Sequence, residues 1–191
     1  MKLNDSILFK GFKKELLNTF GDEKTSFIWK DAQTYLQDLE KNYPDLKKKE
    51  SIFPAVALYR AIEKHASGEA LLFIRDYGTK IGLKVGNIIK VITALPGVPN
   101  LLWKKMDVVA NKMSSGYECK DVILTKHQLK MNVIGCPLYD GAKKLGTPEA
   151  AQLFCCMDKV YMTKMRGVAY QRTKSIAEGD DVCDYQLTDS R

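Results

Sequence analysis

The chain has 191 residues, of which 45% are hydrophobic and 28% charged, and its formal net charge is +7. This composition is typical of one globular domain with its own core and excludes a disordered or fibrous protein. No apolar run reaches the ~20 residues of a membrane span, and the lysines are spread along the chain without clustered arginines and aromatic residues. Neither a membrane nor a nucleic acid is therefore an expected partner.

The N-terminal part of the chain is expected to be helical. Apolar residues recur at three- and four-residue steps up to Gly21, which predicts a helix over 7–20. A second helix is predicted over 24–42 and ends before Pro44, because proline disfavours helical backbone in the preceding residue. Ser51 is the candidate N-cap of a third helix.

The strongly apolar segment 69–95 contains three regularly spaced glycines. Gly78, Gly82 and Gly86 predict a bent or broken helix that packs against other elements. Such an apolar segment suits a ligand pocket and a dimer interface equally well, and a homodimer is the expected oligomeric state. A further helix is expected over 101–113.

The character of the sequence changes after residue 116. Partial alternation of apolar and polar residues over 117–125 and 128–136 predicts two antiparallel strands, which meet near Lys126 and His127. Pro137 is expected to stop the second of these strands.

Another helix and two more strands complete the chain. Thr147 as N-cap, followed by a proline at the first helical position, predicts the start of a helix. The segments 167–177 and 182–189 flank the turn-rich "EGDD" and predict a second strand pair.

The order of these elements indicates the fold class. Helices, a hairpin, a helix and a second hairpin predict an α+β fold, with an N-terminal helical half packed on an antiparallel sheet built from two C-terminal hairpins. We expect a single domain over 1–191, in which 1–50 form a helical N-terminal extension.

Five cysteines are present, and none forms a CxxC pair. An odd number without close pairs fits reduced thiols better than a disulfide framework. The first residues lack an uninterrupted apolar stretch of the kind found in a secretory leader. A cytoplasmic location is the expectation.

Two chemically useful residues lie one helical turn apart near the C-terminus. Cys155 and Asp158 share a helix face in the predicted helix, and Asp158 follows an apolar run. A buried carboxylate needs a partner. In the alternative interpretation Asp158 reaches solvent and the cysteines only fill the core.

The last strand pair adds further candidates. Arg172, Cys183 and Asp184 belong to it, and strand alternation sends Cys183 and Asp184 to opposite faces. Cys136 ends an earlier strand, where a side chain is often presented to a pocket. Three separated cysteines could therefore converge.

A metal site built from the cysteines is one alternative. Structural zinc sites usually bring their ligands in close pairs, which are missing here, and His65 and His127 lie far from the cysteines in the sequence. No metal and no other cofactor is therefore expected.

Three segments resemble the L-2-amino-thiazoline-4-carboxylic acid hydrolases. They are "FPAVALYRAI" (53–62), "GCPLYDGAKKLGTPEAAQLFCCMD" (135–158) and "YQRTKSIAEGDDVCDYQL" (170–187), and the similarity covers about 51–187. An ordered set of motifs carries it: Cys-Pro, Leu-Gly-x-Pro-Glu, Cys-x-x-Asp, Arg-Thr and Gly-x-x-x-Cys-Asp-aromatic. The resemblance singles out the positions Cys136, Cys155, Asp158, Arg172, Thr173, Gly179, Cys183 and Asp184.

The resemblance implies hydrolysis of a small-molecule substrate, a cyclic amidine that opens to N-carbamoyl-L-cysteine. Arg172, with Thr173, would bind the substrate carboxylate, and Asp158 or Asp184 would hold the amidine and act as a base. Cys136 or Cys155 would attack as a thiolate, or else the thiols only line the pocket.

A different class of function also stays open at this point. A non-enzymatic module that binds a small molecule in a cysteine-lined pocket has the same sequence features.

Overall fold

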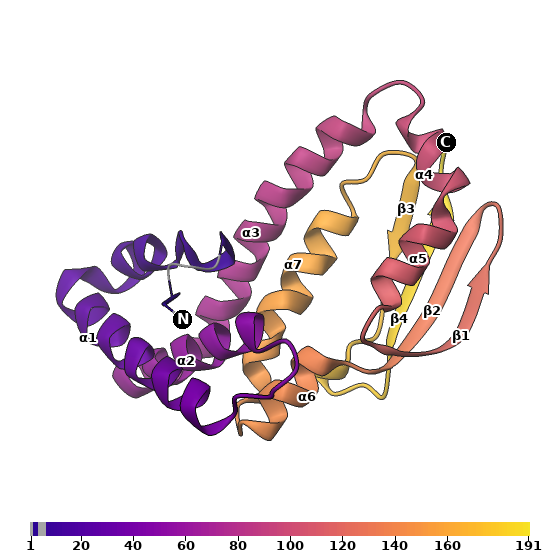
Figure 1. The fold of residues 1–191 in the computed structure, drawn as a ribbon. Helices are drawn as coiled ribbons and strands as arrows, with labels where there is room; N and C mark the ends of the chain where they lie inside the picture. Colours follow the sequence, from indigo (N-terminus) through magenta and orange to yellow (C-terminus); the bar gives the residue numbers. More distant parts are fainter. Residues whose placement is uncertain (1, 4–6) are drawn as a thin grey trace. The chain divides into compact units, whose positions relative to one another are not determined.

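The computed structural model describes residues 2–3 and 7–191 and combines helices with one antiparallel sheet (Figure 1), which confirms the predicted α+β class. Its elements in chain order are η2 (Ile7–Phe9), α1 (Phe12–Asn42), α2 (Lys49–His65), α3 (Ala70–Thr93), α4 (Val98–Lys104), α5 (Met106–Ser114), β1 (Glu118–Leu124), β2 (Gln128–Gly135), α6 (Pro137–Lys144), η3 (Pro148–Ala151), α7 (Gln152–Met162), β3 (Val168–Gln171), η4 (Ile176–Glu178) and β4 (Cys183–Asp189).

The chain forms two compact units. The first consists of the described residues up to 78 together with 138–153, and the second of 79–137 together with 154–191. The expectation of a single domain over 1–191 stays a prediction.

The core of the first unit contains a cluster of aromatic side chains among aliphatic ones. The ring of Phe12 lies 4.5 Å from that of Tyr77 and 5.2 Å from that of Phe73, centroid to centroid. The hydroxyl of Tyr77 donates to the carbonyl of Leu8 at 2.7 Å, so the polar atom of this buried side chain has a hydrogen-bond partner.

Gly21, at φ 75°, interrupts α1, which confirms the predicted division of this region into two helical stretches.

One of the two predicted helix caps is wrong, and the other is confirmed in position. The helix α2 begins at Lys49, after Lys48 in a left-handed conformation, and Ser51 already lies inside its first turn. Thr147 is the N-cap of the 3₁₀ turn η3, with Pro148 at the first position, as predicted. Its side chain makes no cap hydrogen bond, and its hydroxyl accepts a hydrogen bond from Nε of Arg60 at 3.1 Å. The 3₁₀ turn η3 then leads into α7.

The glycines of α3 serve close packing instead of a bend, which corrects the prediction of a bent or broken helix. The helix is continuous over Ala70–Thr93. A Cβ atom at Gly82 would lie 2.6 Å from the carbonyl oxygen of Met157, and one at Gly78 would lie 2.2 Å from that of Leu153. Both partners belong to α7, so the predicted packing against another element is confirmed.

The sheet belongs to the second unit and has the strand order β1-β2-β4-β3. Both predicted hairpins are present, and pairing of β2 with β4 joins them into one sheet. Leu129 and Met131 of β2 stand opposite Leu187 and Tyr185 of β4 and point to the same face, because alternate residues of a strand share a face.

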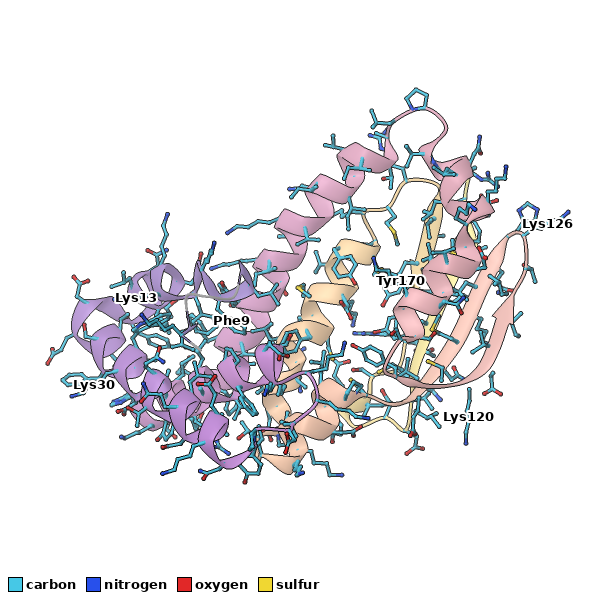
Figure 2. All side chains as sticks on the ribbon, viewed as in Figure 1. Phe9, Lys13, Lys30, Lys120, Lys126 and Tyr170 are labelled. Atoms are coloured by element: carbon cyan, nitrogen blue, oxygen red, sulfur yellow. The ribbon has the colours of Figure 1, made fainter. Side chains whose placement is uncertain are left out.

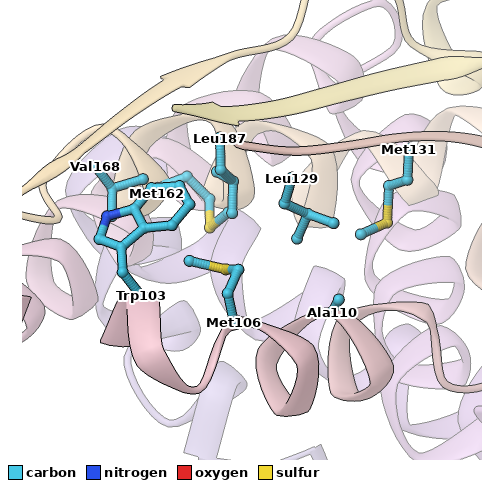
Figure 3. Packing of buried hydrophobic residues seen from close by; sticks show 8 residues of the cluster. All are labelled: Trp103, Met106, Ala110, Leu129, Met131, Met162, Val168 and Leu187. Atoms are coloured by element: carbon cyan, nitrogen blue, oxygen red, sulfur yellow. The ribbon is translucent and has the colours of Figure 1, made fainter. Parts of the chain in front are cut away.

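One face of this sheet is covered by apolar side chains from the helices of the second unit. Figure 3 shows them between strands and helices: Trp103, Met106, Ala110, Leu129, Met131, Met162, Val168 and Leu187. The indole N–H of Trp103 donates to the carbonyl of Gly167 at 2.8 Å, which anchors α4 beside β3.

Several elements differ from the prediction. The helix expected over 101–113 is divided at Lys105 into α4 and α5. Pro137 follows the end of β2 and also begins a helix that was not predicted, α6.

Among the described helices, none alone has both the length and the apolar character of a membrane span. The helices α3 and α4 together have both, but they meet at a 99° bend.

Candidate functional site

A cavity of about 380 Å³ opens in the second unit between the sheet and the helices α5 and α7. Side chains from four elements and one connecting segment line it: Val109, Lys112, Met113, Tyr117, Met131, Val133, Asp158, Tyr161, Met162 and Tyr185. Its wall combines one carboxyl group, three phenol hydroxyls and one exposed amine with valine and methionine side chains.

Asp158 is the acidic group of this cavity. It is half-buried on α7, and burial raises the pKa of its carboxyl group. Hydrogen bonds from Tyr161 and Tyr185 and the positive charge of Arg172 work in the opposite direction but do not cancel this effect. A carboxyl group with a raised pKa in a cavity is a candidate for proton transfer.

Four tyrosines surround Asp158. The hydroxyl of Tyr185 donates to Oδ2 of Asp158 at 3.4 Å, and Tyr161 lies one helical turn further along α7. Tyr117 and Tyr170 are close enough for the negative charge of Asp158 to raise the pKa of each phenol, in addition to the larger effect of burial.

The hydroxyl of Tyr170 is buried and has no hydrogen-bond partner among the described residues. Its ring centroid lies 6.1 Å from that of Tyr185, and Figure 2 shows Tyr170 between α7 and the sheet. Buried polar atoms nearly always have a partner, so this unpaired hydroxyl is unusual. Tyr170 does not line the cavity.

Arg172 contacts residues of the site through its guanidinium. It is only 8% exposed, and its guanidinium donates to the hydroxyl of Tyr185 and to the carbonyl of Cys155, both at 3.1 Å. The same guanidinium lies over the ring of Tyr185, 5.5 Å from its centroid. Arg172 is not part of the cavity wall.

Three cysteines come together beside Tyr117. Cys136, Cys155 and Cys183 all influence the pKa of its phenol. Burial raises the pKa of the Cys155 thiol to about 12, although Arg172 works to lower it. Cys183 is 6% exposed, and its sulfur accepts a hydrogen bond from the backbone N–H of Ile176 at 3.3 Å.

Asp184 and Thr173 lie on the other face of the sheet. The carboxylate of Asp184 accepts hydrogen bonds from the hydroxyl and the backbone N–H of Thr173 and from the N–H of Lys174. Partial burial works to raise the pKa of Asp184, but these hydrogen bonds outweigh it and hold the pKa below its usual range. Both residues line a separate cavity of about 280 Å³.

The structure thus divides the residues singled out in the sequence. Cys136, Cys155, Asp158, Arg172 and Cys183 are brought together on the inner face of the sheet, whereas Thr173 and Asp184 are not. Alternation along β4 explains the division, since Cys183 and Asp184 point to opposite faces.

The histidines lie at neither cavity. Nε2 of His65 is 2.7 Å from Asp31, and Nδ1 of His127 is 2.9 Å from Asp189. Among residues 2–3 and 7–191, no three His, Cys, Asp or Glu side chains are grouped so that they could hold a metal ion. The metal-site alternative therefore has no support from the described geometry.

Sequence reasoning missed the tyrosines and Lys112. The three-residue spacing from Asp158 to Tyr161 on one helix was a usable signal, because side chains at this spacing share a helix face. Tyr117, Tyr170, Tyr185 and Lys112 reach the cavity or its surroundings through the sheet register and through α5, which no local pattern reveals.

The family model for L-2-amino-thiazoline-4-carboxylic acid hydrolase matches residues 46–187. No curated protein matches the chain.

Solved structures of H-NOX proteins are similar to this chain only at a low level. A triple mutant of an H-NOX protein from S. oneidensis in the Fe(II) state has a TM-score of 0.38 and 12% identity, over 100% of this chain and 97% of that one. The Fe(II)NO state of an H-NOX protein from S. oneidensis has a TM-score of 0.37 and 11% identity, over 100% of both chains. A third structure, concerned with heme distortion in the H-NOX family, has a TM-score of 0.32 and 11% identity, over 100% of this chain and 96% of that one. Scores this low support no inference.

Proposed function

Because the chain belongs to the L-2-amino-thiazoline-4-carboxylic acid hydrolase family, we propose that it is a hydrolase that opens a small cyclic amidine, such as L-2-amino-thiazoline-4-carboxylate, to N-carbamoyl-L-cysteine. One observation carries this proposal. A single carboxyl group, Asp158, faces a cavity, has a pKa raised by burial and is surrounded by phenol hydroxyls. A carboxyl group whose pKa is raised in this way is a candidate general base.

Asp158 acts as the general base in this mechanism. In the first step the oxygen of water bonds to the ring carbon between nitrogen and sulfur of the protonated amidine, and Asp158 takes one water proton. In the second step the carbon–sulfur bond breaks and the new hydroxyl becomes the carbamoyl oxygen, while its proton ends on the leaving sulfur. Asp158 then releases its proton to solvent. A positioned base contributes about 10²- to 10⁴-fold to the rate.

The phenols orient the reacting groups. Tyr161 and Tyr185 donate hydrogen bonds to the carboxylate of Asp158, which fixes the oxygen that faces the water. The hydroxyl of Tyr117, which also lines the cavity, offers one more donor for the water or for the developing carbamoyl oxygen.

Water is a better candidate for the nucleophile than Cys155. Burial raises the pKa of the Cys155 thiol to about 12, which disfavours the thiolate that a nucleophilic cysteine needs. The cysteines then contribute a polarisable wall near the site. Mass spectrometry of protein quenched during turnover tests this, because an adduct on Cys136 or Cys155 would restore the covalent route.

Arg172, Thr173 and Asp184 act indirectly in this proposal. Arg172 is a positioning residue, because its guanidinium holds the Tyr185 hydroxyl and the Cys155 carbonyl. Asp184 binds the backbone of 173 and 174, directly after Arg172, and so fixes the segment from which Arg172 projects.

A non-enzymatic binding module is the second candidate, and one observation favours it. Half of the residues that line the cavity are valine or methionine, a composition that suits ligand binding without chemistry. This candidate predicts a bound ligand that the protein leaves unchanged.

Release of free thiol from L-2-amino-thiazoline-4-carboxylate distinguishes the two candidates. The hydrolase proposal predicts thiol release with N-carbamoyl-L-cysteine as the product by mass, and a loss of at least about 100-fold in Asp158→Asn. Asp181→Asn is the matched control, since Asp181 is an exposed carboxylate outside the cavity wall. Absence of thiol release, or equal loss in both variants, contradicts the proposal.

A further inference from the structure

Resting on the proposed function, we infer that the site takes cyclic amidines that carry both a carboxylate, held by Lys112, and an apolar substituent, held by the methionine and valine wall. The observations that carry this inference are the size of the cavity, the chemistry of its wall and the position of its two charged groups.

The cavity is larger than a bare five-membered ring requires. Its volume of about 380 Å³ falls in the range of about 300–1,000 Å³ that is typical of pockets for drug-sized ligands. A ring with only an amino and a carboxyl group leaves part of this space to water.

That remaining space has an apolar wall. Met131, Val133 and Met162 are at most 6% exposed, and Val109 and Met113 of α5 are half-buried. Methionine side chains adapt to the shape of an apolar group, and burying that group is favourable because its surface leaves water. A polar ligand alone gains nothing from these five residues.

The two charged groups differ in depth. Asp158 is half-buried, whereas Lys112 of α5 is exposed and still lines the cavity, which places it at the mouth. Lys112 makes no hydrogen bond or ion pair among the described residues. Since the guanidinium of Arg172 already binds Tyr185 and Cys155, Lys112 is the cation of the cavity wall that can pair with a substrate carboxylate.

Binding of compounds that cannot react separates this inference from the proposed function. Cyclic guanidines, in which a ring nitrogen replaces the sulfur, release no thiol and keep the charge of the amidine. Three probes are needed: 2-amino-imidazoline, its 4-carboxylate, and the 4-carboxylate with a propyl group on the neighbouring ring carbon. Calorimetry measures Kd for each.

The propyl group is expected to lower Kd at least tenfold, since each buried methylene is worth about three- to fourfold. Met113→Gln, which keeps the length of the side chain, is expected to remove at least threefold of this gain. Met113 is chosen because it is half-buried, and a thermal unfolding curve verifies that the variant is folded.

Lys112→Met is expected to raise Kd about two- to fivefold for both carboxylates and to leave 2-amino-imidazoline unchanged, because an ion pair at an exposed site is weak. Lys120→Met is the matched control, as Lys120 is exposed on β1 and does not line the cavity.

Each result decides one question. No gain from the propyl group, equal effects of the two lysine variants, or no binding of any probe overturns the inference, even where thiol release from the thiazoline shows that the protein is a hydrolase. The expected Kd pattern without any thiol release supports this ligand class and refutes the hydrolase proposal.

Discussion

The ionisation of one residue, Asp158, links stability and activity. Burial raises the pKa of its carboxyl group, so the folded protein holds this proton more tightly than the unfolded chain does. The charged carboxylate therefore destabilises the fold at neutral pH, and the same property makes it a useful base. Residues at functional sites often destabilise the folded protein, because the property that makes them useful is costly in the folded state.

Asp158→Asn is expected to raise the thermal unfolding midpoint at pH 7, because the amide removes the cost of a buried charge. The gain should shrink as the pH falls and disappear below about 3.9, where Asp158 is protonated in both states. Differential scanning calorimetry from pH 3 to pH 8 measures it. A lower midpoint in the variant at pH 7 would show that the carboxylate is net stabilising.

Cys155→Ser is expected to keep turnover within about tenfold of the wild type. The thiol is almost entirely protonated at neutral pH, and serine preserves the backbone carbonyl that accepts the hydrogen bond from Arg172. Steady-state kinetics of thiol release measure this effect. A loss of more than 10³-fold in a folded variant would identify Cys155 as the nucleophile.

Tyr185→Phe is expected to shift the pH dependence of activity to higher pH. The hydroxyl of Tyr185 lowers the pKa of Asp158 by donating to its carboxylate, so its removal raises that pKa further. The rising limb of kcat/KM against pH shows the change. Tyr139→Phe provides a control outside the cavity wall, and a shift of the limb to lower pH in Tyr185→Phe would contradict the assignment.

At the level of elements, the packing of α3 on α7 sets the position of Asp158. The glycines of α3 allow the backbone of α7 to approach closely, and α7 carries Asp158 one residue after Met157. A side chain on α3 at these positions would have to push α7 away.

Gly82→Ala is expected to destabilise the protein by about 1–3 kcal/mol, because a Cβ atom there would lie 2.6 Å from a backbone oxygen. Helix propensity alone predicts the opposite, a gain of up to about 1 kcal/mol. Gly141→Ala in α6 is the control, since its nearest neighbour would lie at an ordinary 3.6 Å. Urea unfolding measures both, and equal effects would contradict close packing at Gly82.

The sequence patterns predicted most elements, because apolar periodicity and turn residues act locally. The glycines of α3 misled the prediction, as a glycine that bends a helix and one that admits a neighbouring helix look identical in a single sequence. Thr147 is the predicted N-cap of η3, but its hydroxyl contacts a distant residue, Arg60, and makes no cap hydrogen bond. Contacts between remote segments decide such cases.

For the whole molecule, the candidate site was predictable only in part. The helix spacing of Cys155 and Asp158 and the resemblance to a hydrolase family pointed to α7, which carries Asp158 into the candidate cavity. The register of β2 with β4 and the approach of α5 determine which tyrosines and which lysine reach the cavity. These depend on the assembled sheet and leave no local signature in the sequence.

The central claim is that Asp158 acts as a base and that burial raises its pKa. The pH dependence of kcat/KM for thiol release from L-2-amino-thiazoline-4-carboxylate tests this claim most directly. The expected profile rises with pH to a plateau, with its midpoint above about 3.9, the ordinary pKa of an aspartate, and this limb is absent in Asp158→Asn. A midpoint at or below that value, or the same limb in Asp158→Asn, would contradict the account.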